Sequence, residues 1–150
     1  MEDLSHLRHI AQRQVFADLV NAELLPIIAP LGFVVVDSEV AHVFDNARVD
    51  LQAPELRLRA IRERGCVWVN VGPVSEPGTW FDPDLILIHL GLASITQAMD
   101  REPHAALRGA GQFVVTMWKD LAAMCAPDQL AATKRALNAI AHERAKVLWG

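Results

Sequence analysis

Four short runs of alternating apolar and polar residues follow one another between residues 33 and 72, and this alternation constrains the fold more than any other feature of the chain. A period of two sends successive side chains to opposite faces of a strand. Turn-forming residues separate the runs at Asp45-Asn46, Ala53-Pro54 and Glu63-Arg64-Gly65. The pattern predicts a four-stranded antiparallel meander.

The predicted turns set a register for this sheet. Taking Ala53-Pro54, Glu63-Arg64 and Asp45-Asn46 as the loops, we expect these facing pairs: Val49 with Leu58, Asp50 with Arg57, Leu58 with Val69, and Val40 with Leu51. The apolar residues then share one face, which we expect helices to cover. That face carries Val49, Leu51, Leu56, Leu58, Val67, Val69 and Val71.

The opposite face of the predicted sheet carries arginines and a tryptophan. One expected row reads Val43, Arg48, Arg59, Trp68, and the next reads Ala41, Asp50, Arg57, Asn70. In this register Arg48 and Arg59 face each other and repel, and Trp68 relieves them through a cation–π contact worth about 0.5–1 kcal/mol. A later helix lying over Trp68 is the alternative. Because Trp and Arg are enriched at interface hot spots, we expect a protein-binding surface made by Arg48, Asp50, Arg57, Arg59, Trp68 and Asn70.

Helical patterns flank the sheet. Apolar residues recur at helical spacing from Leu4 to Leu25, and Pro26 and Pro30 are expected to close this first helix. Asp82 suits an N-cap with Pro83 in the first helical position. Further helices are predicted at 112–125 and from Ala126-Pro127-Asp128 to the end of the chain. The prediction is a single α+β domain over residues 1–150: an N-terminal helix, the four-stranded meander and three C-terminal helices.

Composition narrows the function classes. The 150 residues are 52% hydrophobic with a formal net charge of −4, which fits an ordinary globular domain and predicts no general attraction to nucleic acid or anionic lipid. The longest strongly apolar run, Leu85 to Leu92, is too short to cross a bilayer. No signal peptide is visible, so a cytoplasmic protein is expected. Cys66 and Cys125 lack metal-type spacing and are expected to be free thiols.

No catalytic, metal-binding or cofactor motif accompanies these features, so a non-enzymatic module without a cofactor is expected. Two alternatives stay open. One is a small hydrolase or a metal- or ligand-binding protein that uses Asp37, His42 and Asp50. The other is a homodimer that pairs through the C-terminal helices, at the flank formed by Val114 and Trp118 or at Trp149.

Several short segments between residues 32 and 82 also carry a family resemblance. They are Gly32-Phe33 at the start of a strand, the hairpin from Phe44 to Val49, Leu56-Arg57-Leu58-Arg59, Arg62-Glu63-Arg64-Gly65 and Trp80-Phe81-Asp82. In these segments the chain resembles small bacterial α+β proteins of unassigned function. Some of those are thought to be immunity proteins that neutralise polymorphic toxins. The resemblance implies a protein partner and no chemistry.

Overall fold

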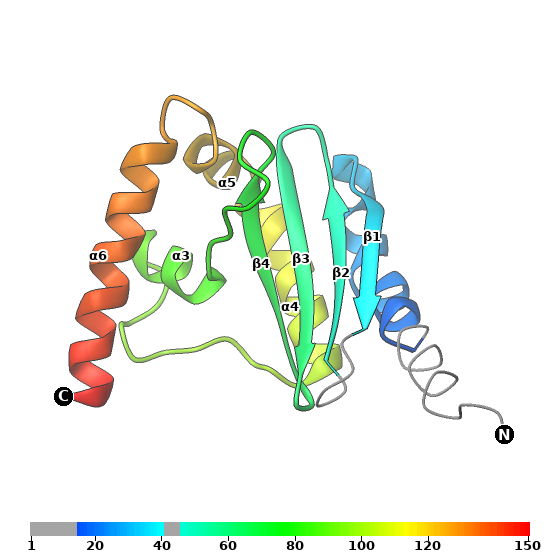
Figure 1. Ribbon diagram of the computed structural model, residues 1–150, viewed down its shortest axis with the longest axis horizontal. Coiled ribbons are helices and arrows are strands. Elements are labelled where there is room, and N and C mark those ends of the chain that lie inside the picture. Colours follow the sequence, from blue (N-terminus) through cyan, green and yellow to red (C-terminus); the bar gives the residue numbers. More distant parts are fainter. Residues whose placement is uncertain (1–14, 41–45) are drawn as a thin grey trace, which may run out of the picture.

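A four-stranded antiparallel sheet organises the computed structural model, which describes residues 15–40 and 46–150 (Figure 1). The strands are β1 (Val34–Val40), β2 (Ala47–Gln52), β3 (Leu56–Glu63) and β4 (Cys66–Pro73). Their spatial order is β1-β2-β3-β4, so each strand pairs with the next one along the chain. The predicted α+β class and the antiparallel meander are confirmed.

The β2–β3 register lies two residues from the predicted one. Asp50 faces Arg59 rather than Arg57. The loop is Pro54-Glu55, because the Ala53 N–H donates to the Leu56 carbonyl oxygen at 2.9 Å. Proline favours the first central position of a turn, where its fixed φ fits, and this preference moves the loop by one residue.

The β3–β4 turn is displaced in the same way. It consists of Arg64 and Gly65, whose φ angles are 50° and 80°. Two positive φ values in a two-residue loop mark a type I′ turn, for which glycine is favoured. Leu58 consequently faces Val71 instead of Val69. A shift of two residues leaves every side chain on its predicted face, so the division into two faces is unaffected.

The β1–β2 pair differs most from its predicted register. Val40 faces Ala47 rather than Leu51, and a bulge interrupts the pairing between Val35 and Asp37. The predicted turn residue Asp45, like Ala41 and Val43 of the predicted rows, lies outside the described residues.

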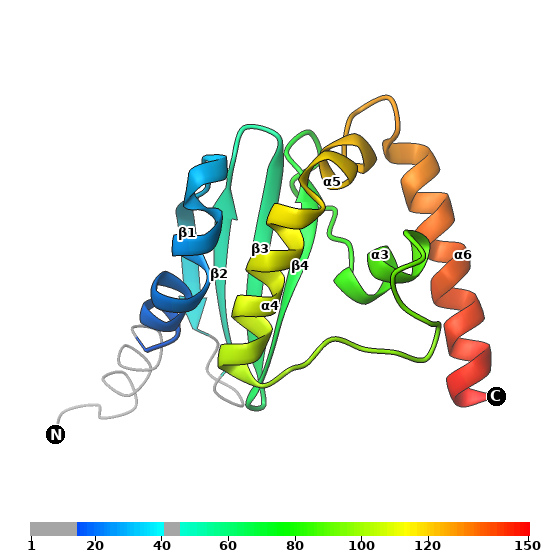
Figure 2. The same cartoon turned by 180° about the vertical axis from the view of Figure 1, so that it is seen from behind.

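Helices cover the apolar face of the sheet, as predicted (Figure 2). Residues 15–23 are helical, and α2 (Leu25–Ile28) and α4 (Pro103–Thr116) follow on the same side. α4 packs on β4 and on α2. All seven residues predicted for this face are buried: Val49, Leu51, Leu56, Leu58, Val67, Val69 and Val71. Burial of one such side chain contributes about 1.5–3 kcal/mol, so this layer is the core.

The first helix is interrupted earlier than predicted. The helical segment 15–23 stops at Leu24, and Pro26 lies in the first turn of α2 rather than closing the preceding helix. A short 3₁₀ turn, η1 (Ala29–Leu31), ends at Gly32 with φ 97°, which turns the chain into β1. The predicted residues 4–14 of this helix lie outside the described residues.

The helix α3 (Pro83–His89) begins as predicted. The Asp82 side chain accepts a hydrogen bond from the Asp84 N–H at 2.8 Å, and Pro83 occupies the first helical turn. The helix ends at His89. It is therefore shorter than its apolar pattern suggests, and only Pro83, Asp84 and Ile86 are buried in it.

Two helices, α4 and α5 (Trp118–Met124), replace the helix predicted at 112–125. Glu102 caps α4 by accepting hydrogen bonds from the N–H groups of residues 104 and 105. Gly111 lies inside α4, ahead of the predicted start of a helix at residue 112. A Cβ at Gly111 would lie 3.1 Å from side-chain atoms of Ile27, so the glycine permits close approach of α4 to α2.

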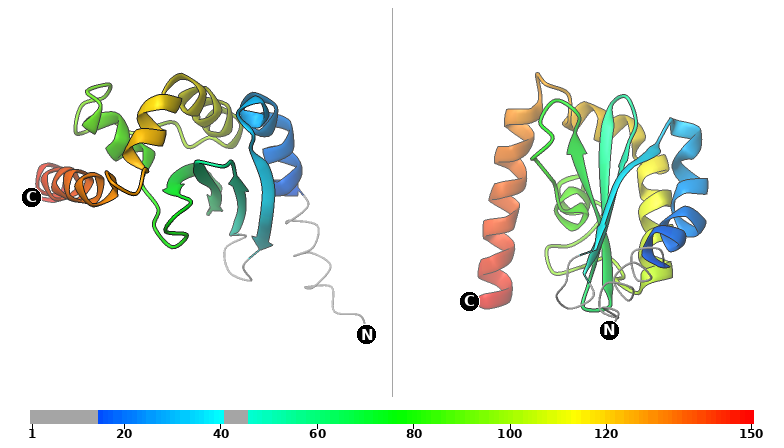
Figure 3. Two further views of the ribbon diagram at one scale, coloured as in Figure 1. Left: turned by 90° about the horizontal axis from the view of Figure 1, so that it is seen from above. Right: turned by 45° about the vertical axis from the view of Figure 1, so that its right-hand side comes forward.

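The last helix, α6 (Leu130–Trp149), packs against α3 beyond β4 and away from the other helices of the core (Figure 3). Its buried residues are Leu130, Thr133 and Leu137, all in its first half. Trp149 at its end is 85% exposed. None of the helices in the described part of the chain is long and apolar enough to cross a membrane.

A buried carboxylate ties α6 to the rest of the fold. Asp84 of α3 is 2% exposed and accepts a hydrogen bond from the Met99 N–H at 2.8 Å. Arg101 and Arg144 approach its second oxygen at 3.3 and 3.6 Å. Because Arg144 belongs to α6, this ion pair joins α6 to α3 and to the segment that precedes α4.

Candidate functional site

No described helix lies across the face of the sheet opposite the core helices, and this face carries the residues predicted to bind a partner (Figures 1 and 3). We call it the polar face. It consists of Arg48 and Asp50 on β2, Arg57, Arg59 and Ile61 on β3, and Trp68 and Asn70 on β4. Of these residues Asp50 is buried and the others are half-buried. The structure therefore brings all six predicted residues onto one surface.

Asp50 lies at the centre of the polar face. Arg59 donates to it through Nε at 2.8 Å and through Nη2 at 3.0 Å. Arg48 donates to the same carboxylate through Nη1 at 2.8 Å. Three charge-assisted hydrogen bonds compensate the desolvation of a side chain that is only 3% exposed. The carboxylate thereby orients both guanidinium groups.

Two exposed acids of β1 complete the ion-pair network. Arg48 Nη2 contacts Glu39 Oε2 and lies 3.3 Å from Asp37 Oδ2. The Glu39 and Asp37 side chains are 63% and 60% exposed, whereas that of Arg48 is 25% exposed. The hydrogen bond to Glu39 and the nearby acidic charges raise the pKa of Arg48, against the opposing effect of burial.

The predicted opposition of Arg48 and Arg59 is wrong. Arg59 faces Asp50 on one side and Asn70 on the other. Arg48 faces Ile61 of β3. The two-residue change in register replaces the expected Arg48–Arg59 repulsion with the attraction between Asp50 and Arg59. No cation–π contact with Trp68 is therefore needed to offset a repulsion.

Trp80 is the aromatic partner of Arg57 and Arg59, a role that the sequence pattern did not predict. Its ring lies 4.6 Å from the Arg59 guanidinium carbon and 5.2 Å from that of Arg57. Arg57 also donates to the Pro77 carbonyl oxygen at 2.8 Å. A Cβ at Gly72 would lie 2.4 Å from the Thr79 carbonyl oxygen and 3.0 Å from the Trp80 ring. A glycine within a strand often marks the close approach of another segment. Gly72 is therefore the residue in the sequence that could have indicated the contact with Trp80.

Trp68 does not face Arg59, whose partner on β4 is Asn70. It faces Ile61, and the Arg101 guanidinium carbon lies 5.2 Å from its ring. Arg101 belongs to the segment between α3 and α4. The expected Arg59–Trp68 contact is therefore wrong. Pro83 and Asp84 at the start of α3 line a small cavity together with Trp68 and Arg101. The Trp68 side chain remains half-buried at the edge of the polar face.

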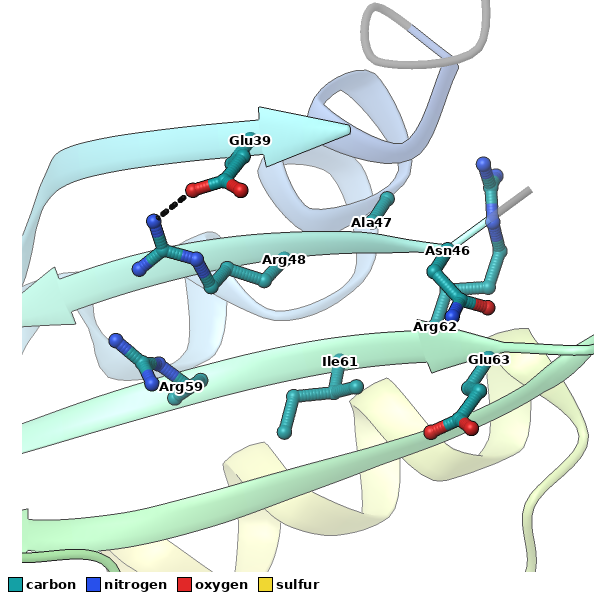
Figure 4. A pocket seen from close by; sticks show the side chains of 8 residues that line it. All are labelled: Glu39, Asn46, Ala47, Arg48, Arg59, Ile61, Arg62 and Glu63. Carbon is teal, nitrogen blue, oxygen red and sulfur yellow. Dashed lines mark hydrogen bonds and ion pairs between the residues drawn. The ribbon is translucent and has the colours of Figure 1, made fainter. Parts of the chain in front are cut away.

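A shallow pocket of about 200 Å³ occupies the β1 side of the polar face (Figure 4). Ile61 supplies an apolar floor between charged groups. The pocket is lined by Glu39, Asn46, Ala47, Arg48, Arg59, Ile61, Arg62 and Glu63. An apolar centre within a charged rim is the usual composition of a protein contact surface.

Catalytic use of the same region has little support. Asp37 and Asp50 do face each other across β1 and β2, whereas His42 lies outside the described residues. Both oxygens of Asp50 already accept hydrogen bonds from arginines, and those are the lone pairs that a metal ion would need. Within residues 15–40 and 46–150, no group of three or more His, Cys, Asp or Glu side chains is placed to hold a metal ion.

No protein-family model, curated protein or solved structure matches the chain.

Proposed function

We propose that the chain is a non-enzymatic protein-binding module whose contact surface is the polar face. One observation carries the proposal: Asp50, buried between Arg48 and Arg59, holds two guanidinium groups in place on a sheet face that no described helix covers. Guanidinium groups held in place before binding lose less conformational entropy on association.

The residue types on this face support the same function. Arginine and tryptophan are enriched at interface hot spots, where they lie around well-packed apolar centres. Ile61 is such a centre, with Arg48 opposite it on one neighbouring strand and Trp68 opposite it on the other. A finer proposal follows from the sequence resemblance alone: the partner is a toxin that this protein neutralises. A toxin gene next to this gene would support that finer proposal.

The variant that tests this proposal must keep the arginines and Asp50. Removal of Arg59 would leave the buried Asp50 without two of its hydrogen bonds and would destabilise the fold. We therefore choose Ile61→Glu, which places a charge at the apolar centre. The matched control is Val115→Glu, which makes a similar change at an exposed position of α4 (45% exposed).

Both variants and the wild type would be used to capture proteins from the native lysate, with recovery quantified by mass spectrometry. The proposal predicts that Ile61→Glu loses at least about 90% of a partner that Val115→Glu retains, which corresponds to about 1.4 kcal/mol. Equal recovery by the two folded variants would reject the polar face as the contact surface.

A further inference from the structure

The two edges of the sheet differ in how their backbone groups are used. The β4 edge is closed by other segments: Val71 and Phe81 exchange two backbone hydrogen bonds of 3.0 and 2.7 Å, and the Val67 N–H donates to the Arg101 carbonyl oxygen at 3.0 Å. β1 is the opposite edge and pairs only with β2 among the described strands. A strand with one paired side presents a row of backbone donors and acceptors to any extended segment.

The direction of those backbone groups follows from the strand pairings. The Ala53 N–H donates toward β3, so the odd-numbered residues of β2 turn their backbone groups to β3 and the even-numbered ones to β1. Asp37 and Glu39 face the even-numbered Asp50 and Arg48, so their backbone groups turn inward to β2. The backbone groups of the intervening Ser38 therefore turn outward from the sheet.

The outward N–H of Ser38 is occupied by a local acceptor. It donates to Asp37 Oδ1 at 2.9 Å. The Asp37 side chain is 60% exposed, and its other oxygen lies 3.3 Å from Arg48. An exposed side chain exchanges readily with water or with an incoming group. Asp37 is therefore a removable cap on this edge.

The side chains of β1 define what the edge can accept. Val34, Val35 and Val36 are 59%, 41% and 49% exposed, an unusual apolar run for a sheet edge. The second half of the strand carries the exposed acids Asp37 and Glu39. A complementary segment has apolar residues beside the valines and basic residues beside the acids.

A second copy of the chain fits this edge poorly. An antiparallel copy that pairs along all of Val34–Val40 is centred on Asp37, so it sets Asp37 against Asp37 of the other copy. Like charges directly opposite each other on neighbouring strands are destabilising. The charges thus select a partner of different sequence.

We propose that the β1 edge binds an extended, basic segment of a partner protein by strand addition. A lysine or arginine of the incoming strand pairs with Asp37 and Glu39 and draws the Asp37 carboxylate away from Ser38. The released Ser38 N–H then donates to a carbonyl oxygen of the incoming strand. This site is the outer backbone edge of β1, which adjoins the polar face through the ion pairs of Asp37 and Glu39 with Arg48. It adds a second contact to the function proposed above.

The probe is a fluorescent ten-residue peptide of alternating valine and lysine, compared with a peptide of alternating valine and glutamate. Ser38→Pro removes the outward N–H and leaves the inward pairing with β2, which edge strands tolerate. Ser38→Ala keeps the N–H and is the matched control. Anisotropy titrations measure binding, and circular dichroism verifies the fold of each variant.

We expect the valine–lysine peptide to bind at least tenfold more tightly than the valine–glutamate peptide, and Ser38→Pro to weaken that binding at least fivefold relative to Ser38→Ala. General charge attraction would favour the lysine peptide but would leave Ser38→Pro and Ser38→Ala equal, and equal affinities overturn the proposal. If Ser38→Pro does not fold, amide exchange of the wild type decides: the peptide must slow exchange in residues 34–40, and unchanged exchange there overturns the proposal. Loss of partner capture by Ile61→Glu bears only on the polar face, so the two proposals fail separately.

Discussion

Arg59 of β3 forms a side-on bidentate ion pair with Asp50 of β2, in which Nε and Nη2 each donate to a different carboxylate oxygen at 2.8 and 3.0 Å. Arg48 shares the second oxygen from the same strand as Asp50. Because the carboxylate is 3% exposed, the three groups form one unit in which each depends on the other two. That unit determines the shape of the polar face.

Removal of the central acid should be costly. Asp50→Ala leaves two half-buried guanidinium groups without their shared counter-ion, and we expect a loss of about 3–5 kcal/mol in the free energy of unfolding. Glu39→Ala is the matched control: it removes an exposed acid from the same arginine and should cost at most about 1 kcal/mol. Urea unfolding measures both.

A double-mutant cycle separates the ion pair from the packing of the side chains. If Asp50 and Arg59 act as one unit, the Asp50→Ala/Arg59→Ala variant loses less than the sum of the single losses, by about 0.5–3 kcal/mol. Strict additivity, or equal losses for Asp50→Ala and Glu39→Ala, would show that Asp50 does not organise the face.

Two glycines of α4 should respond to alanine in opposite directions. Gly111→Ala places a Cβ 3.1 Å from Ile27 and should destabilise the fold by about 1–3 kcal/mol. A Cβ at Gly109 would have no atom within 4 Å apart from the neighbouring backbone of its own helix, so Gly109→Ala should stabilise the helix by about 0.5–1 kcal/mol. Thermal unfolding measures the two variants side by side. Shifts of the same sign would contradict the close packing of α4 on α2.

The two thiols should differ in reactivity. Cys66 is exposed, whereas burial raises the pKa of Cys125 to about 12. Because only the thiolate reacts, a thiol-specific disulfide reagent at pH 8 should modify one cysteine per native chain quickly and the second only after unfolding. Mass spectrometry of the labelled peptides identifies which one. Rapid modification of Cys125 in the native protein would contradict the burial of this thiol at the end of α5.

The N-cap of α3 gives a pH-dependent prediction. Burial raises the pKa of Asp82, although its hydrogen bond from the Asp84 N–H opposes the shift. The charged form is therefore disfavoured in the folded state, and the stability contributed by protonated Asp82 is lost as the pH rises through its raised pKa. Asn caps helices as well as Asp and does not titrate.

Asp82→Asn should consequently gain stability relative to the wild type as the pH rises from the ordinary range of an aspartate toward neutrality. Denaturant titrations of both proteins at pH 3.5 and pH 7 measure the difference. A constant difference between the two would mean that Asp82 titrates alike in the folded and unfolded chains.

Most of the sheet could be predicted because its side-chain period is two. The β2–β3 and β3–β4 registers were each displaced by two residues, so Leu58 and Arg59 fell on their correct faces even though their neighbours were wrong. Neighbour identity depends on turn chemistry, and Pro54 and the Arg64-Gly65 pair each moved a loop by one residue. The one-residue error in the predicted loop set Arg48 opposite Arg59, whereas in the structure Asp50 faces Arg59 and pairs with it.

The helical part was harder to predict because its boundaries depend on tertiary packing. Gly111 lies within α4 at its contact with α2, and no local pattern reveals such a contact between two helices. The role of Trp80 also depends on tertiary contact, since a loop folds back over Gly72 to reach Arg57 and Arg59.

The homodimer contacts predicted in the C-terminal helices differ in exposure. Val114 is buried, and Trp118 packs edge-to-face on Phe33 at 5.8 Å. Trp149 is 85% exposed and is the predicted contact that is free to pair with a second copy.

A comparison of two tryptophans tests the central claim most directly. Trp68 belongs to the polar face, whereas Trp149 lies 85% exposed at the end of α6. With the partner recovered by the wild type, affinity would be measured for Trp68→Ala and Trp149→Ala. If the polar face is the contact surface, we expect at least a tenfold loss of affinity for Trp68→Ala and an unchanged affinity for Trp149→Ala. The reverse order would contradict the polar face and assign binding to the C-terminal helix.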